Sequence, residues 1–132
     1  MQNQDPIIEE ILFELSKENL NTVAIVDLFK NSQDHGTQLI EKMSLELALQ
    51  FWNGQISYQD GNMFMYLLLD FARKFNETYF NEYEFSNIAW ECYLAFDDGE
   101  YYHIGDDKTV DPSEKYTKPC IEKILKKKKL IP

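Results

Sequence analysis

Apolar residues recur every three or four positions along most of this chain, which is the spacing of amphipathic α-helices. Four of the predicted helices follow a residue type that commonly caps a first turn, namely Asp5, Thr37, Ser57 and Asp111. A further helix is predicted over about residues 82–97. Since no repeat or linker divides the sequence, we expect one all-α domain over residues 1–132, a bundle of about five helices.

Three stretches leave the local structure open. Residues 23–29 are rich in β-branched side chains and fit either a short helix or a buried strand. Residues 100–108 break the helical pattern and fit a short β-hairpin or an extended loop. Pro119 either kinks the last helix or begins a second helix that Thr117 caps.

The helix predicted over residues 82–97 carries two apolar stripes. We expect the first stripe in the core: Phe85, Ile88, Ala89, Cys92 and Phe96. The second stripe consists of Tyr83, Asn87, Trp90, Leu94 and Asp97. Such a helix is either buried on both sides, as in many small bundles, or buried on one side and offered to a partner on the other.

The segment from residue 77 to residue 107 holds nine carboxylates and nine aromatic side chains, and it contains no Lys or Arg. Disordered acidic segments are poor in aromatics, so this combination is typical of a folded, negatively charged surface. Such a surface suits a basic protein partner, although the acids would also serve solubility if the aromatics were core. The candidate partner-binding residues are Glu82, Glu84, Trp90, Glu91, Asp97, Asp98, Glu100, Tyr101, Asp106 and Asp107.

The charge distribution argues against a direct nucleic-acid ligand. The net charge is −10, and eight of the 13 basic residues lie in residues 108–132. The first 107 residues therefore carry 5 basic and 20 acidic residues, and a body that negative repels phosphate backbones.

The compartment is indicated by the cysteines and by the apolar runs. Cys92 and Cys120 form no disulfide framework or zinc spacing, and both are expected to be reduced and buried. The longest apolar run, residues 63–69, is far shorter than a membrane span, and residues 1–6 lack the basic start of a signal peptide. We expect a cytoplasmic protein without a membrane anchor.

No catalytic motif was found in the sequence, so we expect a protein that is not an enzyme and needs no cofactor. The two histidines, His35 and His103, lie in different predicted loops. His103 stands among five carboxylates, which leaves a metal site or a surface histidine as its two interpretations, but the spacing does not fit a calcium-binding loop.

Residues 51–57, Phe-Trp-Asn-Gly-Gln-Ile-Ser, end one predicted helix and start a strongly apolar one. This pattern, followed by an acidic helix and loop and a terminal helix, resembles bacterial immunity proteins of the colicin D immunity type over roughly residues 40–130. Residues 111–119 are also similar to immunity proteins of contact-dependent and polymorphic toxins. Gly61 and Asn62 depart from the family pattern, in which an apolar residue is usual.

The resemblance implies a helical bundle that binds and blocks a nuclease toxin carried by the same cell, without fixing which carboxylates make the contact. The leading hypothesis is therefore a binding protein that occupies the cationic active site of a basic toxin with its acidic surface. The alternatives are a cytoplasmic adaptor or regulatory domain with no toxin partner, and a metal-dependent enzyme centred on His103.

Overall fold

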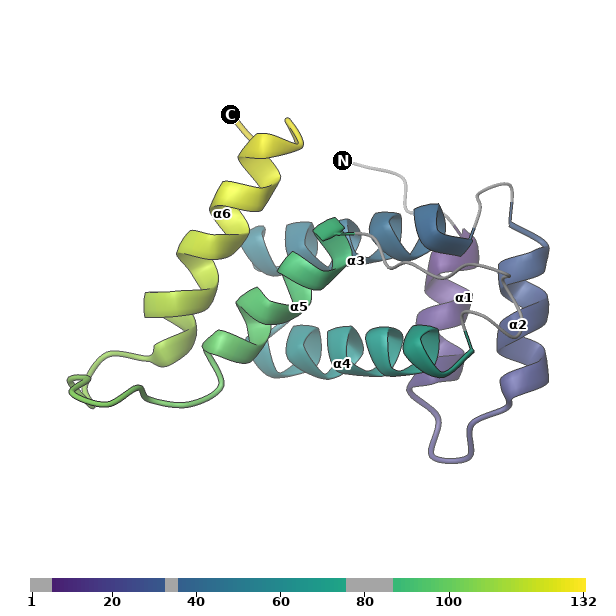
Figure 1. Cartoon of the computed structure of the whole chain (residues 1–132), viewed down its shortest axis with the longest axis horizontal. Coiled ribbons are helices and arrows are strands. Elements are labelled where there is room, and N and C mark those ends of the chain that lie inside the picture. Colours follow the sequence, from purple (N-terminus) through teal and green to yellow (C-terminus); the bar gives the residue numbers. More distant parts are fainter. Residues whose placement is uncertain (1–5, 33–35, 76–86) are drawn as a thin grey trace.

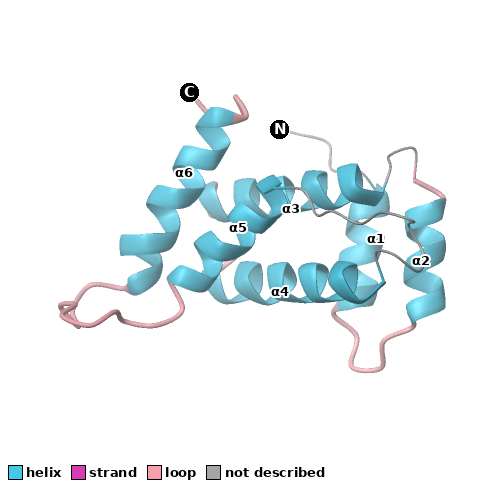
Figure 2. Ribbon diagram, viewed as in Figure 1, coloured by secondary structure: helices cyan, strands magenta, loops and turns pink. Residues whose placement is uncertain are grey.

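Two long helices, α3 (Gly36–Trp52) and α4 (Tyr58–Phe75), run antiparallel through the middle of the molecule (Figure 1). This computed structural model describes residues 6–32, 36–75 and 87–132. The described residues form helices and loops without a strand (Figure 2), which confirms the all-α prediction. In particular, residues 100–108 form turns rather than a hairpin.

A helical hairpin packs at one end of this central pair. It consists of α1 (Pro6–Leu15) and α2 (Thr22–Lys30), and α1 contacts α4 while α2 reaches α3. The stretch that fitted a helix or a strand is therefore a helix. Its start is fixed by Asn21, whose side-chain oxygen accepts a hydrogen bond of 3.1 Å from the Ala24 backbone N–H.

Two further α-helices of the described residues join the bundle. Helix α5 (Asn87–Asp98) packs against both α3 and α4, and α6 (Lys118–Lys127) packs against α5 and α3 at the end opposite the hairpin (Figure 1). The described part of the predicted 82–97 helix therefore begins at residue 87, and Glu82, Tyr83, Glu84 and Phe85 lie outside the described residues.

One apolar core joins the six α-helices of the described residues. Its largest fully buried side chains are Ile11, Leu15, Ile25, Leu39, Ile40, Met43, Leu47, Met65, Leu68, Phe96, Ile121 and Leu125. Full burial of each large apolar side chain contributes roughly 1.5–3 kcal/mol relative to exposure, so the core is the main source of stability.

The turn between α3 and α4 follows the sequence prediction closely. Gly54 has a positive φ of 74°, which ends α3 in a conformation that glycine adopts without steric strain. Ser57 then accepts a hydrogen bond of 3.1 Å from the Asp60 backbone N–H and so caps α4. The prediction that Thr37 caps α3 was wrong, because α3 already begins at Gly36 and Thr37 lies within its first turn.

The last helix is preceded by a π-helical turn, η2 (Ser113–Thr117). Asp111 accepts hydrogen bonds from the backbone N–H and hydroxyl of Ser113, at 2.9 and 2.8 Å, which agrees with its predicted place at a helix start. Pro119 lies in the first turn of α6, directly after η2, and it has no backbone N–H to donate to the preceding helical turn. Thr117 is not the cap that one alternative required, because its own backbone is helical (φ −69°, ψ −51°).

The two cysteines differ in their surroundings. Cys92 is buried, and burial raises the pKa of its thiol to about 12, with a smaller contribution from the negative charge of Glu91. Cys120 is exposed, so the prediction that both are buried was wrong for this residue. It lies on α6 just before Ile121, and the inward face of that helix is formed by Ile121, Ile124 and Leu125 instead.

Among the described helices, none combines the length and the apolar character that crossing a bilayer requires.

Candidate functional site

Helix α5 buries one of its two predicted stripes and exposes the other. Ile88, Ala89, Cys92 and Phe96 are buried, as predicted for the first stripe. In the second stripe Trp90 is 47% exposed and Leu94 is 44% exposed, and Asn87 and Asp97 are exposed as well. The arrangement buried on both sides is therefore wrong, because every described residue of the second stripe is exposed.

The exposed stripe continues onto α4 as an aromatic patch. Trp90 stacks on Tyr93, with ring centroids 5.2 Å apart and an interplanar angle of 22°. Tyr66 of α4, which is 54% exposed, lines the same shallow hollow as both rings. The sequence pattern did not single out Tyr66, because this residue lies in a segment that is apolar almost all round and in which every side chain was expected to be buried.

A groove of about 470 Å³ separates α5 from α6. Its base includes the buried Ala95 and Ile124, and Leu94 and Cys120 are exposed along it. The charged residues that line it are Glu91, Asp97 and Asp98 from α5 and Lys123 and Lys127 from α6. One ion pair joins the two helices across the groove, with Lys127 Nζ 3.6 Å from a carboxylate oxygen of Glu91.

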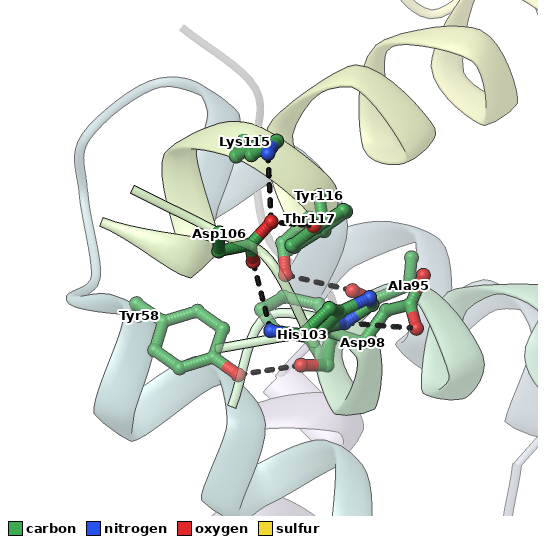
Figure 3. A network of polar contacts seen from close by, with 9 residues as sticks. Tyr58, Ala95, Asp98, His103, Asp106, Lys115, Tyr116 and Thr117 are labelled. Atoms are coloured by element: carbon green, nitrogen blue, oxygen red, sulfur yellow. Dashed lines mark hydrogen bonds and ion pairs between the residues drawn. The ribbon is translucent and has the colours of Figure 1, made fainter. Parts of the chain in front are cut away.

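The carboxyl end of α5 is held by side chains from three other segments (Figure 3). The hydroxyl of Tyr58 donates to the carbonyl of Phe96, and the hydroxyl of Thr117 donates to the carbonyl of Ala95 at 2.7 Å. His103 Nε2 lies 2.9 Å from the Asp98 carbonyl oxygen. The last carbonyls of a helix lack partners within the helix, so these contacts fix the position of its end.

Tyr58 is held firmly in this arrangement. Burial raises its pKa to about 12, and the negative charge of Glu100 adds to the shift. The phenol therefore stays protonated and able to donate its hydrogen bond throughout the physiological pH range.

The loop over residues 99–112 is organised around Asp106. One oxygen of this carboxylate accepts from Lys115 Nζ at 2.8 Å and from the Tyr116 hydroxyl at 2.6 Å, and the other accepts from the His103 backbone N–H at 2.8 Å (Figure 3). These bonds, that of Lys115 foremost, hold the pKa of Asp106 well below its usual range. The His103 ring stacks on Tyr116 with centroids 3.7 Å apart.

Two of the candidate carboxylates are therefore engaged in shaping the loop. The side chain of Asp106 is only 7% exposed, so the prediction that this carboxylate is exposed was wrong. Asp107 is exposed but accepts from the backbone N–H and the hydroxyl of Thr109, at 2.9 and 2.8 Å. The two side-chain partners of Asp106, Lys115 and Tyr116, both lie outside the acidic segment, which is why the sequence pattern gave no sign of this role.

The other candidates divide into three groups. Asp97, Asp98 and Glu100 are exposed and adjacent at the carboxyl end of α5. Trp90 and Glu91 lie further along the same helix, and Tyr101 is 72% exposed in the loop. Glu82 and Glu84 lie outside the described residues. We call the surface formed by Trp90, Leu94, Asp97, Asp98 and Glu100 the α5 face.

The metal-site interpretation of His103 gains no support from the geometry. Within the part of the chain that the structure describes, no three His, Cys, Asp or Glu side chains come together as metal ligands. The His103 ring is in contact with Tyr116, and its Nε2 faces Asp98 through both the carbonyl oxygen at 2.9 Å and a carboxylate oxygen at 3.8 Å.

The charges of the α5 face oppose the dipole of their own helix. The carboxyl end of a helix carries a partial negative charge, which favours Lys or Arg nearby and disfavours carboxylates. The last turn of α5 contains Asp97 and Asp98 and no basic residue. Asp97 and Asp98 therefore create a negative potential at a point where the helix dipole disfavours negative charge.

The network of Asp106 leads to a prediction of pH dependence. A carboxylate whose pKa is lowered on folding stabilises the protein above its unfolded pKa of about 3.9 and loses that effect as the pH falls through the folded value. We expect Asp106→Asn to be less stable than the parent at neutral pH, with the difference shrinking as the pH falls below about 4. Urea unfolding of both proteins across this range measures it, and two parallel curves would contradict the role of Asp106.

Gly99 gives a second prediction. It is buried directly after α5, and a Cβ at this position would overlap the Thr117 hydroxyl and lie 2.8 Å from the Ser113 Cα. Gly99→Ala should therefore lower the free energy of unfolding by about 1–3 kcal/mol, because η2 must move and the bond from Thr117 to Ala95 is strained. Gly105→Ala is an instructive control, since nothing lies within 4 Å of its Cβ and only its positive φ opposes the change. Thermal unfolding of both variants distinguishes crowding from backbone strain.

No protein-family model matches this chain, and the comparisons with curated proteins and with solved structures likewise gave no match. The resemblance to immunity proteins of the colicin D type therefore rests on the sequence motifs alone.

Proposed function

We propose that this chain is an immunity or antitoxin-type protein that neutralises a basic bacterial toxin, a nuclease, by covering its cationic active site with the α5 face. The observation that carries the proposal is the pair Asp97 and Asp98, exposed at the carboxyl end of a helix, where the helix dipole disfavours carboxylates. Residues that oppose the stability of a fold are often kept for function.

Electrostatics supports a cationic partner. A nuclease grips phosphates with basic side chains, and a cluster of carboxylates offers the same sign of charge as its substrate. The negative end of the α5 dipole adds to the field of Asp97, Asp98 and Glu100. A complementary potential of this kind speeds encounter and disfavours acidic partners.

The aromatic part of the α5 face supplies the large contact side chain that a stable interface needs in addition to charge. Trp and Tyr are enriched among the residues that carry most of the energy of an interface, and such residues cluster near its centre. Trp90 stands in the same stripe as Asp97, two turns away, and its stacking on Tyr93 holds the indole in one orientation.

The first test is whether the gene beside that of this chain encodes a nuclease, and the absence of such a gene would count against the proposal. The purified nuclease is incubated with its RNA or DNA substrate and increasing amounts of the protein. We expect inhibition that is complete at equal concentrations, and an association rate that falls as salt is raised, because long-range steering is screened. A neighbouring nuclease that stays fully active and forms no complex on gel filtration would reject the proposal in favour of an adaptor role.

The opposition between charge and stability can be measured without any partner. Asp97→Lys should raise the free energy of unfolding by about 0.3–1 kcal/mol, because a cation replaces an anion at the carboxyl end of α5. Glu9→Lys, near the start of α1, should have the opposite sign because a carboxylate is favoured there. Urea unfolding at low salt measures both changes. A destabilised Asp97→Lys would show that the carboxylate supports the fold instead.

A further inference from the structure

The two ends of the groove between α5 and α6 differ in their charges. The two helices run in opposite directions past it, since Thr117, just before α6, bonds to Ala95 whereas Lys127 at the end of α6 pairs with Glu91. The end nearer Glu91 is thus closed by an ion pair. The other end carries Asp97 and Asp98, for which no Lys or Arg partner is found among the described residues.

Its middle is apolar and partly uncovered. Leu94 is 44% exposed above the buried Ala95 and Ile124, and Cys120 is exposed on the opposite side. The volume of about 470 Å³ accommodates more than one side chain of a partner. Leu94 and Asp98 are four residues apart, so the apolar and acidic parts of the groove are separated by about one helical turn, or roughly 6 Å.

We propose that this groove binds a cationic amphipathic helix of the partner, in which a large aliphatic residue and a Lys or Arg stand three or four residues apart. This inference rests on the proposed function and identifies the part of the partner that the chain recognises. An apolar channel between two neighbouring helices is a common seat for a third helix, which inserts residues from one face.

Charge complementarity selects a cationic occupant over the alternatives. Three carboxylates and two lysines line the groove. Lys127 pairs with Glu91, which leaves Asp97 and Asp98 against Lys123 alone. The chain as a whole has a net charge of −10, so a second copy or an acidic segment would be repelled during approach. A helix that presents its aliphatic residue over Leu94 places its basic residue beside Asp98.

Cys120 makes the site directly observable. It is exposed in the groove, whereas Cys92 is buried with a raised pKa, so a maleimide reagent alkylates Cys120 selectively. The probe is a fluorescein-labelled synthetic peptide of about 15 residues with Leu on one helical face and Lys on the other. A scrambled peptide of the same composition serves as its matched control. Binding is followed by fluorescence anisotropy, and occupancy of the groove by the rate of Cys120 alkylation.

We expect the amphipathic peptide to bind the full chain and to slow alkylation of Cys120 at least about tenfold at saturation, while the scrambled peptide does neither. Asp97→Asn combined with Asp98→Asn should weaken binding about tenfold or more. Glu9→Gln combined with Glu18→Gln makes the same change in net charge at exposed positions remote from the groove, and it should change the affinity by less than about twofold.

Three results would overturn the proposal. Binding without protection of Cys120 would place the peptide elsewhere, for example in the acidic hollow beside Phe13 on the α1–α2 hairpin. Equal binding of the scrambled peptide would show that the protein recognises the charge of the peptide and does not require an amphipathic helix. Protection of Cys120 that rises with protein concentration alone, together with a dimer seen by light scattering, would identify a second copy as the occupant.

A separate variant tests the groove and the proposed function independently of each other. Cys120→Arg fills the groove with a long basic side chain at an exposed position, so the fold is retained. We expect this variant to lose inhibition of the nuclease. Inhibition that survives Cys120→Arg but is lost when Asp97 and Asp98 are reversed would reject the groove and retain the function of the α5 face.

Discussion

Replacing Phe96 with alanine should lower the free energy of unfolding by about 3–5 kcal/mol, the range found when a large buried ring is removed. Phe96 is fully buried at 0% exposure. Its ring meets Phe51 edge-on at 5.3 Å and stacks on Tyr58 at 6.0 Å, so it joins α5 to the ends of α3 and α4. Domains of this size are stable by only about 5–15 kcal/mol, and the loss is correspondingly severe.

The measurement is urea unfolding followed by circular dichroism. Leu94→Ala is the matched control, because it removes an aliphatic side chain from the same helix at a position that is 44% exposed. We expect the control to differ from the parent by no more than about 0.5 kcal/mol. Equal midpoints for the two variants would show that the buried and exposed sides of α5 have been assigned wrongly.

Reversing Asp97 and Asp98 together to lysine should weaken the complex with the nuclease by about 2–5 kcal/mol if the proposed function is correct. The two positions are exposed in the free protein, and contact with a cationic active site would remove them from water. The lysines would then face basic side chains of the same sign, so loss of attraction is compounded by repulsion.

The affinity is measured by titration calorimetry, and protection by cleavage of the nuclease substrate. Glu9→Lys with Glu18→Lys repeats the charge change on the far hairpin and should alter mainly the association rate. The double reversal at α5 should act chiefly through faster dissociation. Undiminished protection by the Asp97 and Asp98 variant would remove the α5 face from the mechanism.

Local signals in the sequence predicted most of the fold. Ser57 and Gly54 act through neighbours within a few residues, so the turn between α3 and α4 was predicted correctly. The role of Gly61 is explained only by the structure. A Cβ there would lie 2.8 Å from the Phe96 ring, so glycine at this position leaves room for the ring.

The candidate site was harder to predict because the role of each residue depends on partners that are distant in the sequence. Asp97 and Asp106 look alike in the sequence, yet one is exposed and the other is bound by Lys115 and Tyr116. Periodicity likewise identified both stripes of α5, but it could not indicate which stripe the neighbouring helices cover. Cys120 was misplaced for the same reason, because apolar surroundings in sequence do not determine which face of a helix is inward.

Side chains from distant parts of the chain cap the end of α5, so the acidic surface reaches its final arrangement only when those parts have folded together. Tyr58, His103 and Thr117 each bond to one of the last carbonyls of α5, and they come from three separate parts of the chain. During synthesis, Asp97 and Asp98 leave the ribosome well before Thr117 is available to dock. A growing chain therefore carries these acids without presenting them in their final arrangement. Under the proposed function, recognition of the nuclease is deferred until η2 and α6 have been added.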